Sequence, residues 1–267
     1  MTPFDDAVAL REQPDGSWLG HTSPEYANMV GPFGGVTAAV MLNAALSDRR
    51  RAGEPVALTV NFAAPVEDGP FSVRARIARN NRSTQHWSVE IVHGEEVVAT
   101  ATSVFAQRRE TWSQAEVTMP SGLPGPEDLP RMPVHGRPQW VHRYDMRFIR
   151  GSLPAFDEVE QPDSTSCLWL RDDPPRPIDF LSLAAVCDNF FPRLYIRRRK
   201  RSPVGTVSLT TYFHADGAML AQQADRFVLG VARAVNFRNG FFDQSAEIWS
   251  DAGQLLASTH QVVYYRD

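Results

Sequence analysis

Residues 31–50 read GPFGGVTAAVMLNAALSDRR, a run of small and apolar residues with several glycines at its start. The run predicts one long helix near residues 34–48, opened by Gly34 and Gly35. The stretches after it alternate apolar and polar residues, which is the pattern of half-buried strands. They are LTVNFAAP (58–65), FSVRARIARN (71–80), QHWSVEIVHG (85–94) and EVVATATSVFAQR (96–108).

The second half of the chain repeats this order of elements. PIDFLSLAAVCDNFFP, at residues 177–192, predicts a second helix near residues 179–191, which Pro192 brings to an end. Alternating stretches again follow the helix. They are VGTVSLTTYFHAD (204–216), RFVLGVARAVNFRN (226–239), DQSAEIWSDAG (243–253) and QLLASTHQVVYYRD (254–267).

Two pairs of segments match between the halves. AAVMLN at residues 38–43 matches AAVCDN at 184–189, and VVATATSVFAQR at 97–108 matches LLASTHQVVYYR at 255–266. The second match sets Ser103 opposite Gln261. One match between apolar strands could arise by chance, but two in the same order favour an internal duplication.

A helix wrapped by antiparallel strands, present twice, predicts an α+β fold made of tandem hotdog domains. Each half then has one long helix packed on an antiparallel sheet. The join is expected where prolines accumulate and hydrophobic periodicity is lost. We therefore expect an N-terminal hotdog at residues 1–109, a Pro-rich linker at 110–139 and a C-terminal hotdog at 140–267. A generic mixed α+β fold, with similar strands, is the alternative.

Composition narrows the class of protein. The 267 residues, 43% of them hydrophobic, suffice for one large core or two smaller ones. A net charge of −4 argues against nucleic acid as the partner and favours a small molecule. Cys167 and Cys187 are the only cysteines and no apolar run opens the chain, so we expect a cytoplasmic protein without disulfides or a membrane span. The spacing of His and Cys indicates no metal, and no other cofactor is expected.

Longer strings carry a resemblance over nearly the whole chain. They are GPFGG (31–35), ARNNRSTQHWSVEIVHGEEVVATATSVFA (78–106), YDMRF (144–148), CLWLRDDPPRPIDFLSLAAVCDNFFP (167–192), GTVSLTTYFHAD (205–216) and RNGFFDQSAEIWSDAGQLLASTHQ (238–261). In this order and spacing they resemble the type II acyl-CoA thioesterases, which have a double-hotdog fold. The resemblance implies an acyl-CoA substrate, hydrolysed to free acid and CoA by an activated water without a covalent enzyme intermediate.

The resemblance also implies three site residues. In that family an Asp on the second helix, a Thr on the strand after it and a Gln on the last strand hold the attacking water. By motif these fall on Asp188 in AVCDNFFP, Thr206 in GTVSLTTYFH and Gln261 in ASTHQ. By the same resemblance, backbone N–H groups meet the oxyanion. The chain departs from the family where valines, and not Glu and Gly, follow Gln261, and in the basic run from Arg197 to Arg201. These departures bear on acyl preference more than on the chemistry.

The residue pattern supports buried positions for two of the three. Asp188 falls on the same stripe of the predicted helix as Leu181 and Ala185, where a carboxylate needs hydrogen-bond donors. Gln261 falls on the apolar face of its strand. That face also holds Leu255, Ala257, Thr259 and Val263. The alternatives are an exposed Asp near a helix end and an outward-facing Gln beside His260.

Strand alternation gives less support to Thr206. It groups Thr206 with Ser208 and Thr210, while Leu209 and Phe213 occupy the other face. A Thr in a strand is usually there because it favours strands. The role of Thr206 in the site therefore rests on the resemblance alone.

The first half lacks equivalents of the site residues. The positions that match are Leu42, Ser103 and approximately Pro55, none of them a carboxylate or an amide. We therefore expect the chemistry in the second half, with the first half supplying a partner surface and part of the substrate pocket. Uncovered sheet edges and faces predict a homodimer or higher homo-oligomer.

Other functions stay open. One is a hotdog hydratase or dehydratase on acyl thioesters, which would need a His beside the carboxylate. Another is a double hotdog that binds acyl-CoA without turnover. An acyl-enzyme has little support, because the chain has no G-x-S-x-G motif and Cys187 has no neighbouring His. The run from Arg197 to Arg201 is either a solvated loop or a contact for the phosphates of CoA.

Overall fold

The structure is a computed structural model that describes residues 1–153 and 155–266, so Pro154 and Asp267 lie outside it. Its strands are β1 (Arg11–Glu12), β2 (Trp18–His21), β3 (Glu54–Phe62), β4 (Pro70–Asn80), β5 (Thr84–His93), β6 (Glu96–Ala106), β7 (Tyr144–Arg150), β8 (Ser166–Asp172), β9 (Val204–Phe213), β10 (Val228–Arg233), β11 (Phe237–Arg238), β12 (Phe241–Trp249) and β13 (Leu255–Tyr265). Its helices are α1 (Pro3–Ala7), α2 (Gly34–Leu46), α3 (Phe180–Val186), α4 (Arg193–Arg198) and α5 (Gly217–Gln223), with 3-10 turns η1 (Pro24–Tyr26), η2 (Pro126–Asp128) and η3 (Gln139–Arg143). None of these described helices combines the length and the hydropathy that a membrane crossing needs.

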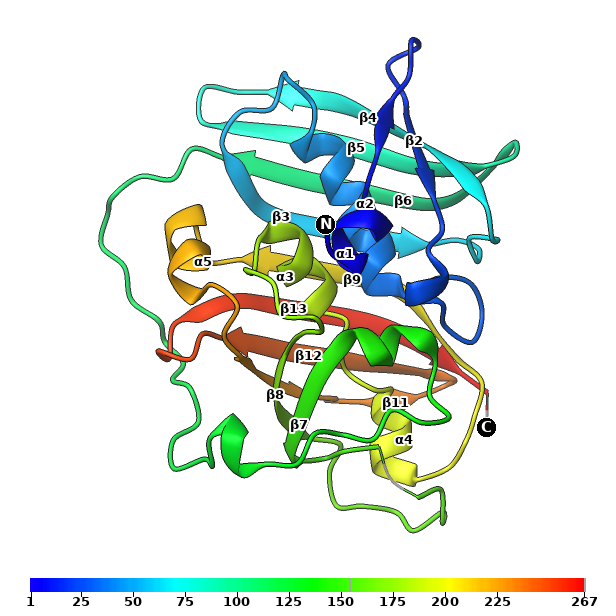
Figure 1. Cartoon of the computed structure of the whole chain (residues 1–267), viewed down its shortest axis with the longest axis vertical. Helices are drawn as coiled ribbons and strands as arrows, with labels where there is room; N and C mark the ends of the chain where they lie inside the picture. The colour runs from blue at the N-terminus through cyan, green and yellow to red at the C-terminus, as the bar shows by residue number, and fades with distance from the viewer. Residues whose placement is uncertain (154, 267) are drawn as a thin grey trace.

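The described strands form one antiparallel sheet of 13 strands. Its order is β1-β2-β4-β5-β6-β3-β9-β13-β12-β10-β8-β7, and β11 pairs with β12. The strands of the first half therefore lie together on one side and those of the second half on the other (Figure 1). β3 and β9 join the two sides, and the hydroxyl oxygens of Thr59 and Thr210 lie 3.0 Å apart across this joint.

Helix α2 is buried along most of its length. Ala38, Ala39, Met41 and Leu42 have no exposed surface, and the helix contacts β4, β5 and α3. In Figure 1, α2 and α3 lie beside each other in the middle of the molecule. α2 begins at Gly34, as the sequence predicts, and ends two residues before the expected position. The predicted helix on an antiparallel sheet is thus confirmed for the first half.

The second helix is much shorter than the predicted 179–191. The prediction of one long helix in the second half is therefore wrong. α3 ends at Val186, and α4 begins only after Pro192. Proline disfavours helical backbone at the residue before it, so a helix cannot run on to Phe191, and the chain already turns at Cys187 and Asp188. Asp188 therefore lies in the turn after α3 and not on a helix.

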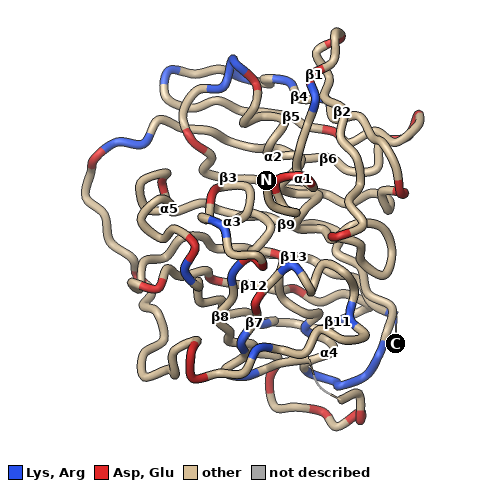
Figure 2. Tube along the Cα trace, viewed as in Figure 1, with Lys and Arg blue, Asp and Glu red and all other residues tan. Residues whose placement is uncertain are grey.

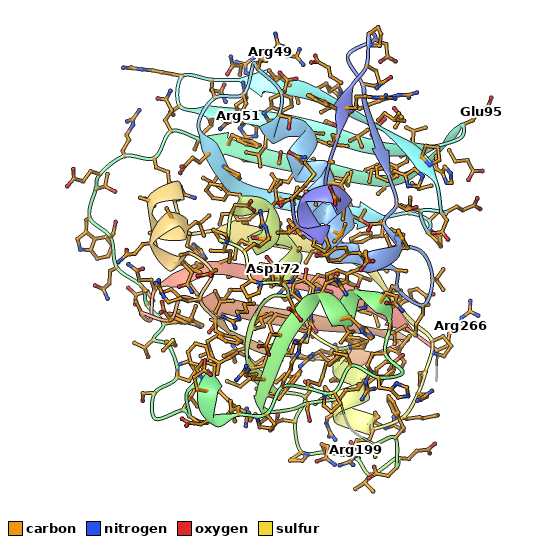
Figure 3. The ribbon with its side chains drawn as sticks, in the orientation of Figure 1. Arg49, Arg51, Glu95, Asp172, Arg199 and Arg266 are labelled. Carbon is orange, nitrogen blue, oxygen red and sulfur yellow. The ribbon has the colours of Figure 1, made fainter. Side chains whose placement is uncertain are left out.

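The guanidinium of Arg176 ties the N-terminus to the segment before α3. Its Nη2 lies 3.1 Å from Asp5 on α1 and 2.8 Å from Asp179, and its plane lies over the ring of Phe4. Asp172, labelled near the middle of the molecule in Figure 3, lies 3.8 Å from the other nitrogen of the same guanidinium. These half-buried ion pairs hold first-half residues against the elements that lead into the site.

The segment between β6 and β7 packs on the second half. Over its described residues it contains no strand, only the turns η2 and η3. Leu123 and Leu129 contact the cluster around Trp169, and the indole N–H of Trp169 donates to the carbonyl of Pro124 at 3.0 Å. An irregular connection is what the proline-rich composition of this segment predicts.

The close approach of α2 to α3 requires a glycine at position 35. A Cβ added there would lie 2.6 Å from the carbonyl oxygen of Ala185, so we expect Gly35→Ala to lower the free energy of unfolding by about 1–3 kcal/mol. Helix propensity alone would instead raise it by about 1 kcal/mol. Urea unfolding measures the difference. Gly125→Ala, where the added Cβ has only Asp128 at 3.6 Å, is the control, and a Gly35→Ala protein as stable as this control would contradict the steric argument.

Candidate active site

The structure brings Asp188, Thr206 and Gln261 together. The side-chain amide of Gln261 donates from Nε2 to Oδ1 of Asp188 at 2.7 Å. The hydroxyl of Thr206 donates to Oε1 of Gln261 at 3.3 Å. Three residues from the turn after α3, from β9 and from β13 therefore form one chain of hydrogen bonds.

The carboxylate of Asp188 also meets the first turn of α2. It accepts a hydrogen bond from the backbone N–H of Gly35, and a Cβ at Gly34 would come within 2.8 Å of Oδ2. The N-terminus of a helix carries a partial positive charge that favours an anion. The first half thus contributes a backbone donor to a carboxylate of the second half.

Burial makes Asp188 a weaker acid than an ordinary aspartate. Loss of solvation raises the pKa of Asp188 to about 7, although the hydrogen bonds from Gln261 and Gly35 act in the opposite direction. A carboxyl group with this pKa changes protonation near neutral pH. It can therefore take up and release a proton under ordinary conditions.

Gln261 lies on the face of β13 that the alternation predicts. Its side chain is buried, as are Ala257, Thr259 and Val263 on the same face. His260 points the other way and is exposed, with its ring nitrogen 3.1 Å from the hydroxyl of Ser245. The alternative of an outward-facing Gln261 is excluded.

Thr206 does not follow the alternation of its strand, and the grouping of Thr206 with Ser208 is wrong. Thr206 pairs with Val263, whereas Ser208 pairs with Val262, so Val207 is an extra residue between two consecutive pairs. Such a β-bulge reverses the alternation of side chains beyond it. The bulge turns Thr206 towards Gln261 and leaves Val207 at the surface.

A cavity of about 730 Å³ opens onto the three residues. Its walls are largely apolar and contain several aromatic residues. They include Phe33, Trp140, Phe156, Phe190, Phe191 and Tyr195. The rings of Phe33 and Trp140 stack at 4.3 Å between centroids, and Asn28, Met29 and Phe33 bring the first half into the wall, as expected. A cavity with apolar walls and a few polar groups is typical of a small-molecule site.

Two residues of the site, Gln244 and Arg193, were not predicted from the sequence. Gln244 on β12 lines the cavity and accepts a hydrogen bond from the guanidinium of Arg193 at 2.8 Å. Arg193 has no exposed surface, and burial lowers its pKa to about 9. Gln244 shares the buried face of its strand with Phe242 and Ala246, so the alternation that pointed to Gln261 could also have found it.

The structure places Cys187 in the core. Cys187 is fully buried, and loss of solvation raises the pKa of its thiol to about 12, so it stays protonated as expected of a core residue. Among the described residues, no group of three or more His, Cys, Asp and Glu has the arrangement of a metal site. The titratable group at the cavity that the structure singles out is therefore Asp188.

The basic run from Arg197 to Arg201 begins in the last turn of α4, which ends at Arg198, and continues beyond the helix (Figure 2). Arg197 and Arg199 pair with Glu160 and Asp157, each at 2.6 Å, and so fasten the loop before β8. Arg201 is exposed and lines the cavity. Part of the run thus has a structural partner, while its last residue stands at the cavity.

Both halves of the chain match domains of a known family. The acyl-CoA thioesterase N-terminal domain matches residues 23–106, and the acyl-CoA thioesterase C-terminal domain matches residues 126–265, more than half of the chain. The chain belongs to the acyl-CoA thioesterase family. Asp188, Thr206 and Gln261 all lie in the part that matches the C-terminal domain of these thioesterases.

Solved structures agree on the fold. A conserved protein of unknown function with a hot dog fold from Alicyclobacillus acidocaldarius is 49% identical over 100% of this chain and 99% of that one, with a TM-score of 0.95. A putative thioesterase II from Thermobifida fusca is 18% identical over 100% and 98%, with a TM-score of 0.83. An acyl-CoA thioesterase II from Mycobacterium marinum is 19% identical over 98% of each chain, with a TM-score of 0.78. The fold is therefore a hot dog fold with a large antiparallel sheet and few helices. No curated protein matches the sequence.

The raised pKa of Asp188 makes stability depend on pH. Its pKa is about 7 when folded and about 3.8 when unfolded, so its contribution to stability is complete below pH of about 4 and is lost as the pH rises through 7. Asp188→Asn removes the buried charge, and we expect it to raise the unfolding free energy at pH of about 8 by on the order of 1 kcal/mol or more. Thermal unfolding across this pH range should show the two proteins converging in acid. Glu116→Gln, an exposed acid between β6 and β7, is the control, and an Asp188→Asn protein that is no more stable at high pH would refute the burial argument.

Proposed function

We propose that this protein is an acyl-CoA thioesterase that hydrolyses acyl-CoA through a water held by Asp188, Thr206 and Gln261. The observation that carries the proposal is the hydrogen-bonded chain from Thr206 through Gln261 to Asp188, which borders the cavity. A thioester carbon is already electrophilic, so hydrolysis needs a positioned water, a base and donors for the developing oxyanion. The site offers the first two of these from side chains.

Each of the three side chains has a defined task in this mechanism. The water donates one hydrogen bond to Asp188, which takes its proton as the water attacks the thioester carbon. The Thr206 hydroxyl gives its own hydrogen to Gln261 and keeps an oxygen lone pair to accept from the water. Gln261 holds the carboxylate in place. The tetrahedral intermediate collapses by breaking the carbon–sulfur bond, and the CoA thiolate leaves with the proton from Asp188.

The cavity suits the two ends of an acyl-CoA molecule. Its aromatic wall can bury an acyl chain, because apolar surface gains about 25 cal/mol for each Å² removed from water. Arg137 and Arg201 also line the cavity and can form charge-assisted hydrogen bonds with the phosphates of CoA. Of the basic run from Arg197 to Arg201, we therefore propose Arg201 as the residue that contacts the phosphates of CoA.

The competing functions have less support. A hydratase would need a His beside the carboxylate, and none of the described residues that line the cavity is a His. Burial raises the pKa of the Asp188 carboxyl group beside the cavity to about 7. Such a shift is typical of a catalytic group, and binding without turnover does not require it. Assay of thiol release from acyl-CoA decides between thioesterase and binding protein.

The halves of the chain are, in this proposal, two tandem hotdog domains. The matches at residues 23–106 and 126–265 support a division into two domains, and the second match begins inside the proposed linker. We propose an N-terminal domain at 1–109, a linker at 110–139 and a C-terminal domain at 140–267. The sheet order supports the same division, because among the described strands those of the first half and those of the second half pair only between β3 and β9. The C-terminal domain would carry the chemistry, since the matching first-half positions hold buried Leu42 and Ser103.

Asp188→Asn tests the mechanism. The substitution keeps the shape of the side chain but removes the base, so kcat for acyl-CoA hydrolysis should fall by on the order of 10² or more. In the wild type, kcat/KM should rise as the pH increases through about 7, because only the ionised carboxylate accepts the proton. Thiol release measured against pH should show this rise in the wild type and not in the variant.

Gln261→Ala is the companion variant. It should lose less activity, because the carboxylate remains and only its positioning contact is removed. Arg51→Gln, an exposed change in the loop before β3, should behave as wild type. Unchanged thiol release by Asp188→Asn would show that the water is activated by another group.

The outer face of the sheet supports the expected homo-oligomer. Side chains on β9, β12 and β13 leave apolar surface exposed there. They are Val207, Tyr212, Phe241, Val262 and Tyr264, each between 38% and 51% exposed. Apolar side chains gathered on neighbouring strands favour association. We propose that a second copy of the chain covers this face.

Val262→Lys tests this association. A charge in the middle of a covered apolar face should weaken the oligomer by about tenfold or more in dissociation constant. Sedimentation equilibrium should give a multiple of the 29.8 kDa chain for the wild type and a lower mass for the variant. Val117→Lys, a residue of similar exposure between β6 and β7, is the matched control. A wild type that stays monomeric at micromolar concentration would refute the homo-oligomer.

A further inference from the structure

Gln244 places a second amide beside the three proposed site residues. In the register of β12 and β13 it lies directly opposite Gln261, so the two side chains leave the same face of the sheet with Cβ atoms about 5 Å apart. Gln244 is 2% exposed and lines the cavity. Since Gln261 reaches Asp188, Gln244 borders the space next to the reacting group.

Arg193 determines which way the amide of Gln244 points. Its Nε lies 2.8 Å from Oε1 of Gln244. A guanidinium group only donates hydrogen bonds, so the oxygen of the amide faces Arg193 and the NH₂ group faces away. Within the described part of the chain, Nε2 of Gln244 has no hydrogen-bond partner, yet it is not enclosed by protein atoms. The NH₂ group therefore faces the cavity.

Arg193 is itself held rigidly. It is fully buried and donates to the carbonyl oxygens of Phe191 and Ser164 and to the hydroxyl of Ser166. No carboxylate of the described residues pairs with it, so its positive charge is met only by neutral acceptors, the oxygen of Gln244 among them. A cation on the oxygen of an amide polarises that amide and makes its NH₂ group a stronger donor.

We propose that Gln244 is a specificity residue that donates a hydrogen bond to a hydroxyl or oxo oxygen on the acyl group, close to the thioester. This proposal rests on the thioesterase function above and names its substrate class. The wall around Gln244 is apolar, with Phe190, Phe191 and Val263 lining the same cavity. An unsubstituted acyl chain leaves the NH₂ group without a partner, whereas an oxygenated chain satisfies it. Because the Cβ atoms of Gln244 and Gln261 lie about 5 Å apart, we take the third carbon, two bonds from the thioester carbon, as the position of that oxygen.

The test compares two thioesters of equal chain length, a 3-hydroxyacyl-CoA and the unsubstituted acyl-CoA. We expect wild type to prefer the hydroxylated thioester in kcat/KM, and this preference to fall by about tenfold or more in Gln244→Leu and in Gln244→Glu. Gln244→Glu retains an oxygen for Arg193 but cannot donate while ionised, so it removes the donor without disturbing the pair. Thermal unfolding shows that each variant is folded. Ser245→Ala, the next residue on β12 and outside the cavity, should keep the wild-type preference.

Two outcomes would overturn the proposal. A preference that is the same in wild type and in both Gln244 variants would show that the amide does not contact the acyl group. An equal loss of kcat/KM on both thioesters would show that Gln244 contacts the thioester group and not an oxygen on the acyl chain. Dissociation constants of the two matching S-alkyl-CoA thioethers, which cannot be hydrolysed, test the same preference by binding. If wild type hydrolyses neither thioester, the proposed function fails, while the thioether comparison still decides the role of Gln244.

Discussion

The rest of the structure depends on one partly buried carboxylate. Asp188 receives hydrogen bonds from the amide of Gln261 and from the backbone N–H of Gly35, which belong to opposite halves of the chain. An unsatisfied charge in this place would cost several kcal/mol. The glycine at position 34, which opens α2, follows from it, because a Cβ there would meet the carboxylate at 2.8 Å. If the halves moved apart, the carboxylate would lose the backbone N–H of Gly35 and keep only the amide of Gln261.

Features that depend on local pattern could be predicted from the sequence. The start of α2 at Gly34 follows from the small residues there, and the burial of Gln261 follows from the alternation along β13. The motif resemblance assigned the acid and the amide to the second half, and the repeat showed that the matching first-half positions hold neither. The motif resemblance added Thr206, which the structure places 3.3 Å from Gln261.

Features that depend on contacts between distant segments could not be predicted. The early end of α3 reflects the path of the chain towards Pro192, while its apolar spacing continues as if the helix went on. The bulge at Val207 changes the face of Thr206 through a register shift that only the pairing with β13 creates. The contact of Arg193 with Gln244 spans 51 residues and leaves no trace in local pattern. In each case tertiary structure overrides a local preference.

The joint between β3 and β9 has a consequence for synthesis on the ribosome. Thr59 and Thr210 are separated by 151 residues, and pairings at such a separation form late because a long loop must close first. A nascent chain can therefore fold α2 and its strands long before β9 leaves the exit tunnel. During that interval β3 is an open strand edge that can pair with a neighbouring chain. The speed at which translation delivers β9 thus sets how long each new molecule is prone to aggregate.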